Sequence, residues 1–261
     1  MRISILTICP EYFAGFREVP MIKRSLTKDR LEFEVIDIRT FAPGSFRRVD
    51  DSPYGGGNGL ILRCQPVVDA IRNIRTEESH VIALAPIGQP YVQEKARELA
   101  KKEHIILLCG HFEGFDARIY SYVDEIISVG DYVLSGGEIP AMAVTDSIVR
   151  LLPGNLRDGS AEDESFENGL LEYPQYTKPA EFEGQKVPEV LLSGDHEAVR
   201  RWRQEKALEI TKERRPDLMD LWDTGHDCDE VHDVCTGRRS ARCDETLYQC
   251  IVRKWNHKRC I

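Results

Sequence analysis

Residues 105–116 read IILLCGHFEGFD, an unbroken apolar run that passes directly into a glycine-containing loop. Such a run is typical of a strand that is buried on both faces of a sheet. Glycine after the strand lets the backbone approach a ligand closely. The same order returns in residues 81–89, VIALAPIGQ, and in residues 125–138, EIISVGDYVLSGGE. Because parallel strands bind ligands at their carboxyl ends, these loops indicate a ligand site; ordinary turns, which every α/β protein needs, are the alternative interpretation.

The surrounding sequence has the alternation of an α/β domain. Two more apolar runs, Ile3–Ile8 and Phe33–Ile38, predict strands. Helical spacing of apolar residues occurs in four ranges, Pro66–Ile74, Val92–Lys101, Ala117–Tyr122 and Ile139–Leu151. Strands that alternate with helices predict an α/β fold with a mostly parallel sheet, covered by helices on both faces.

The chain changes character after Pro153-Gly154, which ends the last of these helices. Residues 155–168 are polar and acidic, a composition typical of a linker. A proline-punctuated stretch follows, and a further helix is predicted from about His196 to Arg214. We therefore predict an α/β domain over residues 1–154, a flexible linker over 155–168, and a small helical domain over 169–261.

The composition indicates a cytoplasmic protein. No apolar run approaches the roughly 20 residues that a membrane span needs, and the apolar start of the chain leads into Cys9-Pro10-Glu11 without a signal-peptide cleavage site. The 8 cysteines are therefore expected to be free thiols. Five of them crowd the tail: Cys228, Cys235, Cys243, Cys250 and Cys260. None of the tail spacings is the Cys-x-x-Cys pair typical of structural zinc, so we predict no metal ligands; a metal-dependent, partner-binding tail is the alternative.

The net charge of −9 argues against nucleic acid as a partner when it is taken alone. The charge is unevenly distributed, however. Residues 217–233 carry acidic side chains and no Lys or Arg, whereas basic residues gather at 200–215 and again at 238–259. An acidic chain with such blocks can still present a basic face to nucleic acid, although a solvated helix surface is the alternative interpretation.

Several stretches together resemble the bacterial tRNA (guanine-37-N1)-methyltransferases. They are VDDSPYGGG at 49–57, GHFEGFD at 110–116, GDYVLSGGEIPA at 130–141, GLLEYPQYT at 169–177, and VLLSGDH at 190–196 with RRWR at 200–203. These motifs follow one another in matching order, and the resemblance covers roughly residues 1–216. Residues after about 217 lie outside it.

The resemblance implies a fold and a methyl donor. This family belongs to the SPOUT methyltransferases, whose α/β domain contains a deep trefoil knot, an exception to the usual avoidance of threaded chains. By resemblance the protein is a homodimer whose active site is shared between subunits, with the donor site and the linker carboxylate from different subunits, and its knot loops hold S-adenosylmethionine. The residues implied at the donor site are Leu84, Pro86, Gly110, Phe112, Glu113, Val129, Gly130, Asp131, Tyr132, Val133, Leu134, Gly136 and Gly137.

The reaction needs a proton acceptor and a cation. Guanine N1 carries a proton at neutral pH, so a carboxylate is needed to remove it while a cation stabilises the charge that develops on O6. The family's arginine matches Arg150; the alternative for Arg150 is an ion pair with Asp146 on the helix surface. Alignment on Ser165-Phe166 puts Glu164 where the family has aspartate, with Asp163 just before it. Glu164 is our first choice of base, and Asp163 is the alternative.

The resemblance also implies how tRNA is held. The predicted substrate residues are Asp50, Tyr54, Gly55, Gly56, Gly57, Asp195, His196, Arg200 and Arg201. The arginines suit phosphate contacts, whereas Trp202 next to them is expected to be a core residue. Activity that depends on Mg²⁺ is a further expectation from the resemblance. The alternative function is a non-catalytic nucleotide-binding module, which would use the same loops without turnover.

Overall fold

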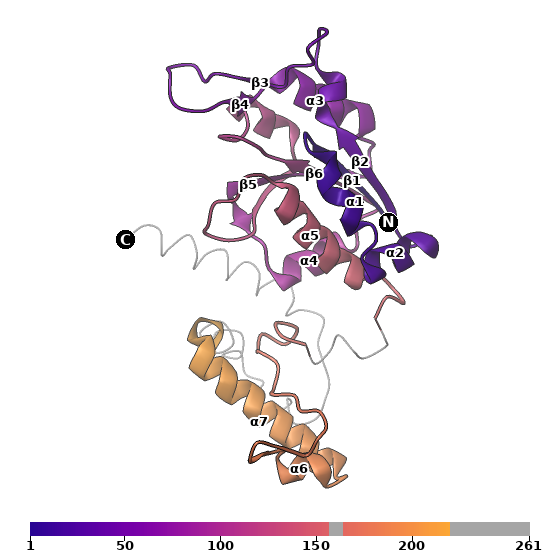
Figure 1. Ribbon diagram of the computed structural model, residues 1–261, viewed down its shortest axis with the longest axis vertical. Helices are drawn as coiled ribbons and strands as arrows, with labels where there is room; N and C mark the ends of the chain where they lie inside the picture. The colour runs from indigo at the N-terminus through magenta and orange to yellow at the C-terminus, as the bar shows by residue number, and fades with distance from the viewer. Residues whose placement is uncertain (157–163, 220–261) are drawn as a thin grey trace, which may run out of the picture. The chain divides into compact units, whose positions relative to one another are not determined.

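The computed structural model describes residues 1–156 and 164–219. The chain forms two compact units, Met1–Leu156 and Arg157–Ile261 (Figure 1). Asn155 belongs to the first unit, because its buried side-chain amide donates to Ser25 Oγ at 2.8 Å and to the Val149 carbonyl at 2.6 Å. Among the helices in the described ranges, none combines the length and the hydropathy that crossing a bilayer requires.

The first unit is built on a 5-stranded parallel sheet with the strand order β2-β1-β6-β5-β7. Its strands are β1 (Arg2–Thr7), β2 (Glu32–Asp37), β5 (Ser79–Pro90), β6 (His104–Cys109) and β7 (Glu125–Ser128). Every residue of the central strand β6 is buried, as its unbroken apolar sequence predicts. The predicted α/β class and the parallel sheet are thus confirmed.

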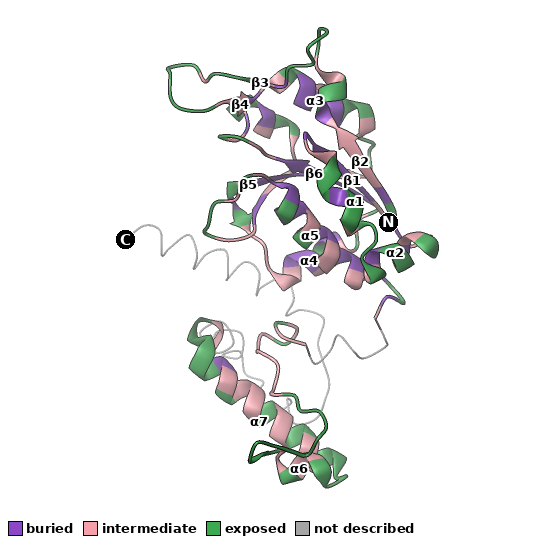
Figure 2. Cartoon of the chain, in the orientation of Figure 1, coloured by how far each residue is buried: buried purple, intermediate pink, exposed green. Residues whose placement is uncertain are grey.

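Helices cover both faces of the sheet. One face packs against α1 (Phe13–Phe16), α2 (Pro20–Thr27), α4 (Gln93–Leu99) and α5 (Glu138–Arg150). The other packs against α3 (Cys64–Ile74) and the 3₁₀ helices η2 (Ile38–Phe41) and η3 (Ala117–Tyr122). Alternate residues of each strand point to opposite faces, so Ile3 and Ile5 enter the first core while Leu6 enters the second. Figure 2 shows the buried residues gathered in the strands and on the helix sides that face them.

Local structure departs from the sequence-based expectation in several places. The range Ala117–Tyr122 is a 3₁₀ helix rather than an α-helix. Strand β5 continues past Leu84 to Pro90, with a register shift between Leu84 and Gln89. Helix α2 was not predicted, although Pro20 in its first turn is a known start signal. The remaining elements near the amino terminus are η1 (Pro10–Tyr12) and the antiparallel pair β3 (Asp50–Asp51) and β4 (Ile61–Leu62).

The second unit is smaller in its described part. It contains a hairpin of β8 (Glu181–Phe182) and β9 (Gln185–Lys186), the short helix α6 (Glu189–Leu192) and the long helix α7 (His196–Arg214). The segment before the hairpin attaches to α7, because the Leu171 N–H donates to the buried Thr211 Oγ1 at 2.8 Å. Trp202 is half-buried on α7, with its ring centroid 6.4 Å from that of Tyr176.

The buried ring of His104 predicts a pH dependence of stability. His104 Nε2 lies 3.0 Å from Ser4 Oγ and Nδ1 lies 2.7 Å from Ser79 Oγ, so the ring links three strands. Burial, and then the charge of Arg2, lower its pKa below the ordinary value near 6.5. The His104 ring is therefore protonated more readily in the unfolded chain than in the folded protein. The free energy of unfolding consequently falls as the pH drops through about 6.5.

We expect the loss of Tm between pH 7.5 and pH 5.5 to be smaller in His104→Gln than in the wild type. The measurement is thermal unfolding across this range at constant ionic strength. His80→Gln is the control, because His80 is bound to Glu125 at 3.2 Å at the same end of the sheet and should leave the His104 contribution in place. Equal losses of Tm in the wild type and in His104→Gln would contradict the assignment.

Candidate functional site

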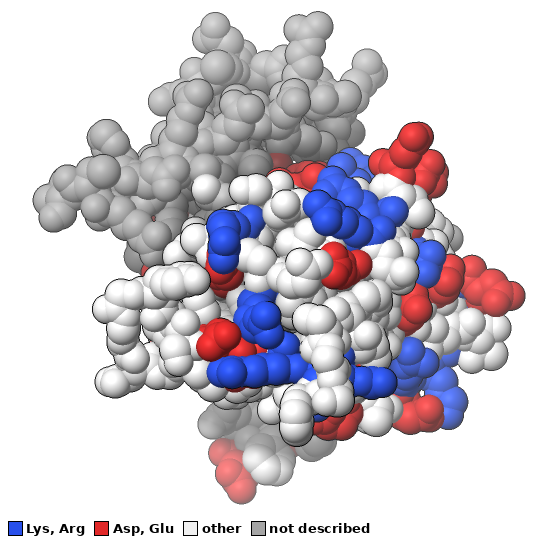
Figure 3. All heavy atoms as spheres, turned by 90° about the horizontal axis from the view of Figure 1, so that it is seen from above, with Lys and Arg blue, Asp and Glu red and all other residues white. Residues whose placement is uncertain are grey.

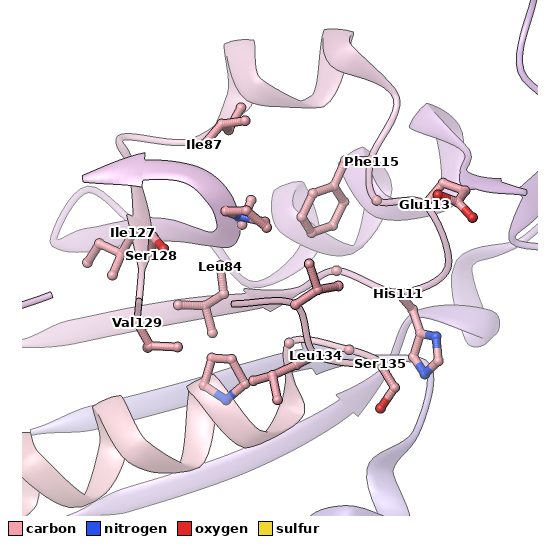
Figure 4. A pocket seen from close by; sticks show the side chains of 18 of the residues that line it. Leu84, Ile87, His111, Glu113, Phe115, Ile127, Ser128, Val129, Leu134 and Ser135 are labelled. Atoms are coloured by element: carbon pink, nitrogen blue, oxygen red, sulfur yellow. The ribbon is translucent and has the colours of Figure 1, made fainter. Parts of the chain in front are cut away.

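A cavity of about 350 Å³ lies where the loops after β5, β6 and β7 meet. This volume falls in the range of small-molecule sites. The walls are mainly apolar, and Figure 4 shows the side chains of Leu84, Phe115 and Leu134 around the cavity, with His111 and Glu113 on one side of it. A ligand held here would therefore be recognised mainly by apolar contact and by backbone amides and carbonyls rather than by ion pairs.

The cavity brings together almost all of the residues that the sequence placed at a donor site. Twelve line it: Leu84, Pro86, Gly110, Phe112, Glu113, Val129, Gly130, Tyr132, Val133, Leu134, Gly136 and Gly137. Asp131 is absent from the lining, although Gly130 and Tyr132 on either side of it are present, and its side chain is exposed. Sequence reasoning missed Ala85, Ile87, His111, Gly114, Phe115, Tyr120, Ile127, Ser128, Ser135 and Pro140. Most of these neighbour predicted residues, so their position in the same loops was the available signal.

Backbone contacts clamp two of the three loops together. The Gly137 N–H donates to the Gly110 carbonyl at 2.7 Å, and His111 forms an isolated antiparallel bridge with Gly136. Phe112, half-exposed at 48%, has a φ of 58°, a left-handed conformation that costs about 1 kcal/mol or more outside glycine. The loop after β6 is therefore held in a strained shape by its neighbours.

A second cavity, of about 480 Å³, lies beside the first and shares His111 and Phe112 with it. Asp50, a predicted substrate residue, lies in its wall. Its remaining lining is Ile8, Cys9, Glu11, Arg39, Phe46, Arg47, Arg48 and Val49. The three arginines share this wall with Glu11 and Asp50, and two of them, Arg39 and Arg48, form ion pairs with Asp37 and Asp51; the sequence motifs did not single out this group of charges.

The glycine loop between β3 and β4 is attached to the loop after β6. The Glu113 N–H donates to the Leu60 carbonyl at 3.0 Å, and the Leu62 N–H donates to the Gly114 carbonyl at 2.9 Å. Tyr54 at the far end of this loop is fully exposed, at 100%. The glycines that follow it, Gly55, Gly56 and Gly57, have positive φ angles of 86°, 81° and 132°. The loop thus carries a glycine segment with little side-chain bulk, in backbone conformations that glycine adopts readily. The two hydrogen bonds fix the start of the loop after β6 beside both cavities.

The predicted catalytic residues lie in different parts of the chain. Arg150 is the half-buried last residue of α5 in the first unit. Glu164 is half-buried at the start of a turn in the second unit, where its carbonyl accepts from the Glu167 N–H at 3.2 Å. Asp163 lies outside the described residues.

The remaining substrate candidates lie at the start of α7. Asp195 is the N-cap of this helix, because its carboxylate accepts from the Glu197 and Ala198 N–H groups at 3.0 and 3.1 Å. These backbone bonds, that of Ala198 above all, lower the pKa of Asp195. His196 is the first helical residue, and Arg200 and Arg201 are exposed one turn further on. Capping gives Asp195 a structural role in addition to any contact with substrate.

The close packing at Gly137 leads to a stability prediction. A Cβ at this position would lie 2.7 Å from Cys109 Cα and 2.8 Å from Gly110 N, both rigid backbone atoms at the end of β6. We expect Gly137→Ala to cost about 1–3 kcal/mol, the usual penalty of overpacking, and to lower Tm by several degrees. Gly15→Ala is the matched control, because a Cβ there meets nothing within 4 Å. The measurement is thermal unfolding of both variants and of the wild type. A Tm of Gly137→Ala equal to that of the wild type would refute the close approach of Gly137 to the backbone of Cys109 and Gly110.

Comparisons with known proteins agree on one family. The sequence model described as tRNA (Guanine-1)-methyltransferase TrmD matches residues 1–221. A tRNA (guanine-N(1)-)-methyltransferase of Dictyoglomus turgidum is 50% identical over 221 residues, which cover 84% of this chain and 90% of the relative. The proteins of the same description from Geobacillus kaustophilus and Malacoplasma penetrans are 49% and 47% identical, each over 84% of this chain and over 92% and 97% of their own lengths.

Proposed function

The chain belongs to the tRNA (guanine-1)-methyltransferase family, and we propose that its target is the guanine on the 3′ side of the tRNA anticodon, position 37. The reaction is the transfer of a methyl group from S-adenosylmethionine to guanine N1 in tRNA. The single observation that carries the proposal is the cavity at the ends of β5, β6 and β7, lined by twelve residues that the motifs assign to the donor.

The donor occupies this cavity in our proposal. S-adenosylmethionine supplies the electrophilic methyl group. The half-buried backbone of Gly110, Gly130 and Gly136 lines the cavity and lets a ligand approach closely, while Leu84, Phe115 and Leu134 suit the flat faces of the adenine base. Gly137→Ala is expected to weaken donor binding as well as stability, because it displaces the backbone of the same loop.

The second cavity and the glycine loop serve the tRNA in this proposal. Asp50 and Tyr54, with Gly55 to Gly57, lie on the loop that is hydrogen-bonded to the donor loop, so a guanine admitted there would approach the first cavity. Removing a base from its stack requires compensating contacts. In the second unit, the exposed Arg200 and Arg201, with Asp195 and His196 beside them, offer contacts to the tRNA backbone.

The charge distribution supports tRNA binding through several separate groups of basic residues rather than through one continuous basic surface. Figure 3 shows several groups of Lys and Arg on the face seen from above, with groups of Asp and Glu between them. Arg39, Arg47 and Arg48 belong to the wall of the second cavity. Binding of tRNA through such separated groups is expected to weaken with rising salt.

The length of α5 supports a site that is shared between two subunits. Its 13 residues span roughly 18 Å at 1.5 Å per residue. Gly137 and Pro140, at its start, line the donor cavity, so Arg150 at the other end is distant from the donor of its own subunit. If Arg150 acts on the guanine, it has to come from a second copy. The exposed apolar side chains of Ile87, Phe112 and Val133 at the cavity, 67%, 48% and 88% exposed, are available to such a contact.

We expect this homodimer to show complementation. A Gly110→Arg subunit lacks a usable donor cavity, and an Arg150→Ala subunit lacks the cation; each is expected to be inactive as a homodimer. A verified heterodimer contains one complete site if the two groups come from different subunits, so its methyl transfer should reach about half of the wild-type rate. The measurement is activity of doubly tagged, purified heterodimers. Absence of recovery would contradict the shared site.

Mg²⁺ is the remaining expectation from the family. Mg²⁺ prefers oxygen ligands, and the one cluster of three potential metal ligands within the described residues contains a thiol and an imidazole. This cluster does not fit Mg²⁺, and no step of the reaction is assigned to the ion. We expect the protein to act in the cytoplasm, where its tRNA substrate is found.

Two other features of the family complete the proposal. The trefoil knot stays a prediction. The close packing of the loops after β5, β6 and β7 agrees with it. The three-part organisation, with a linker over 155–168, also stays a prediction.

The function is tested by methyl transfer from labelled S-adenosylmethionine to an unmodified tRNA transcript. Two transcripts are compared, one with guanine at position 37 and one with adenine there. We expect labelling of the first alone, with N1-methylguanine as the product. Labelling of both would refute the proposed position. Donor binding without labelling of either would instead favour a non-catalytic nucleotide-binding module.

A further inference from the structure

Three potential metal ligands converge between the two cavities. Cys9, His111 and Glu138 each offer a ligand atom, and these atoms lie within 4.8 Å of one another. They come from three separate parts of the chain: the loop after β1, the loop after β6 and the first turn of α5. The proposed methyl transfer assigns no role to this cluster.

The environment of the cluster is organised as a metal site requires. Thr7 Oγ1, which is fully buried, donates to Glu138 Oε1 at 2.7 Å and accepts from the Cys9 N–H at 2.8 Å. One hydroxyl group thus orients the Glu138 carboxylate and fixes the backbone at Cys9. Hydrogen bonds of this kind to the ligands are a regular feature of protein metal sites.

Gly136 packs directly against two of these groups. A Cβ on this residue would overlap Glu138 Oε2 and would lie 3.3 Å from His111 Nε2, so only glycine lets both polar atoms come this close to the backbone. Glu138 itself is only 2% exposed. Access is possible from the second cavity, because Cys9 and His111 both lie in its wall.

The ligand chemistry selects the class of metal. Thiolate and imidazole favour Zn²⁺ and similar divalent transition metals, whereas Mg²⁺ and Ca²⁺ favour oxygen. Three protein ligands with a fourth position open to a cavity are typical of non-structural zinc sites. We propose that Cys9, His111 and Glu138 form a binding site for one divalent transition metal ion of the zinc class.

Binding would involve defined proton movements. The Cys9 thiol releases its proton to solvent when the sulfur becomes a ligand. His111 Nδ1 now accepts from the Phe112 N–H at 3.0 Å; ligation through Nε2 places the ring proton on Nδ1 and breaks this contact. Because Phe112 lines both cavities, an ion at the cluster would change the loop that borders the donor.

Cobalt(II) is the probe, because a Co²⁺–thiolate bond gives a near-ultraviolet charge-transfer band and a tetrahedral site gives strong visible bands. The tail cysteines would contribute similar bands. The experiment therefore uses the full-length protein with Cys228, Cys235, Cys243, Cys250 and Cys260 replaced by serine. We expect one Co²⁺ per chain with a thiolate band, and displacement by one equivalent of Zn²⁺ but not by excess Mg²⁺.

Two variants in this background locate the site. Cys9→Ser is expected to remove the thiolate band and to raise the Kd for Co²⁺ at least tenfold, and His111→Gln to raise the Kd by a similar factor while the protein stays folded by circular dichroism. Cys64→Ser is the matched control, because Cys64 is also a half-buried thiol but lies outside the cluster; its band and Kd should equal those of the parent.

Three results would overturn the proposal: no thiolate band in the parent, an unchanged band and Kd in Cys9→Ser, or displacement of Co²⁺ by Mg²⁺. Because every readout is metal binding, these results are independent of whether the protein methylates guanine 37.

Discussion

Replacing Arg150 with alanine is expected to lower kcat for guanine methylation by about a hundredfold to a thousandfold, the usual loss when a group that stabilises developing negative charge is removed. The charge develops on guanine O6 as N1 loses its proton. The affinity for S-adenosylmethionine should change less than twofold, because the donor cavity lies at the other end of α5. Arg150→Lys is expected to retain part of the activity, since it keeps the charge but not the planar guanidinium.

The measurement is single-turnover methyl transfer with saturating donor, together with donor affinity by calorimetry. Arg72→Ala is the matched control, because Arg72 is likewise a basic residue in the last turn of a helix, α3, and its removal has the same effect on the helix dipole. A loss confined to Arg150→Ala assigns the residue to the reaction. A similar loss in both variants, or a loss of Tm that matches the loss of activity, would mean that Arg150 only stabilises the fold.

Glu164→Gln is expected to reduce the single-turnover rate about a hundredfold, since removal of a general base costs a factor of about 10² to 10⁴. Asp163→Asn should remain close to wild type. Glu164 opens an ordered turn: the Phe166 N–H donates to the Leu170 carbonyl at 2.8 Å, and the Glu172 N–H donates to Ser165 Oγ at 3.0 Å. These hydrogen bonds fix the backbone next to Glu164. The one extra methylene of the glutamate side chain, relative to aspartate, lets the carboxylate reach further from this backbone.

The pair of substitutions separates the two candidate bases. Each is compared at several pH values, because a lost base should also remove the acidic limb of the pH–rate profile. Glu167→Gln serves as the control within the same turn, as it is also half-buried. If the single-turnover rate falls only in Asp163→Asn, then Asp163 is the general base, and the assigned function is unchanged. Undiminished rates in both variants would contradict a carboxylate from this segment.

The cluster of Cys9, His111 and Glu138 could not be predicted from the sequence and is seen only in the tertiary structure. Each residue is ordinary in the sequence: Cys9 follows a predicted strand, His111 lies within a motif, and Glu138 begins a helix. Nothing in their spacing predicts a metal site. They meet because the carboxyl ends of parallel strands open onto one edge of the sheet, and the strand order that places β1 beside β6 is a long-range pairing.

The donor cavity was more predictable. Its three loops each follow an apolar strand run, and the resemblance of these loops to one family identified Gly110, Gly130 and Gly137. The tertiary structure added Phe115 and Ile127, which are apolar and therefore looked like core residues. It also explained Asp195, whose motif suggested substrate binding but whose carboxylate caps α7.

The sequence by itself determined the strands, the principal helices and the family, because hydrophobic periodicity and motif order are local properties of the chain. It missed α2 and the pair β3 and β4, whose segments are short and weakly patterned. The strand order and the adjacency of the two cavities were decided by the tertiary structure alone. Each depends on contacts between residues that are far apart in sequence, which form only when the buried faces of the sheet and helices pack together.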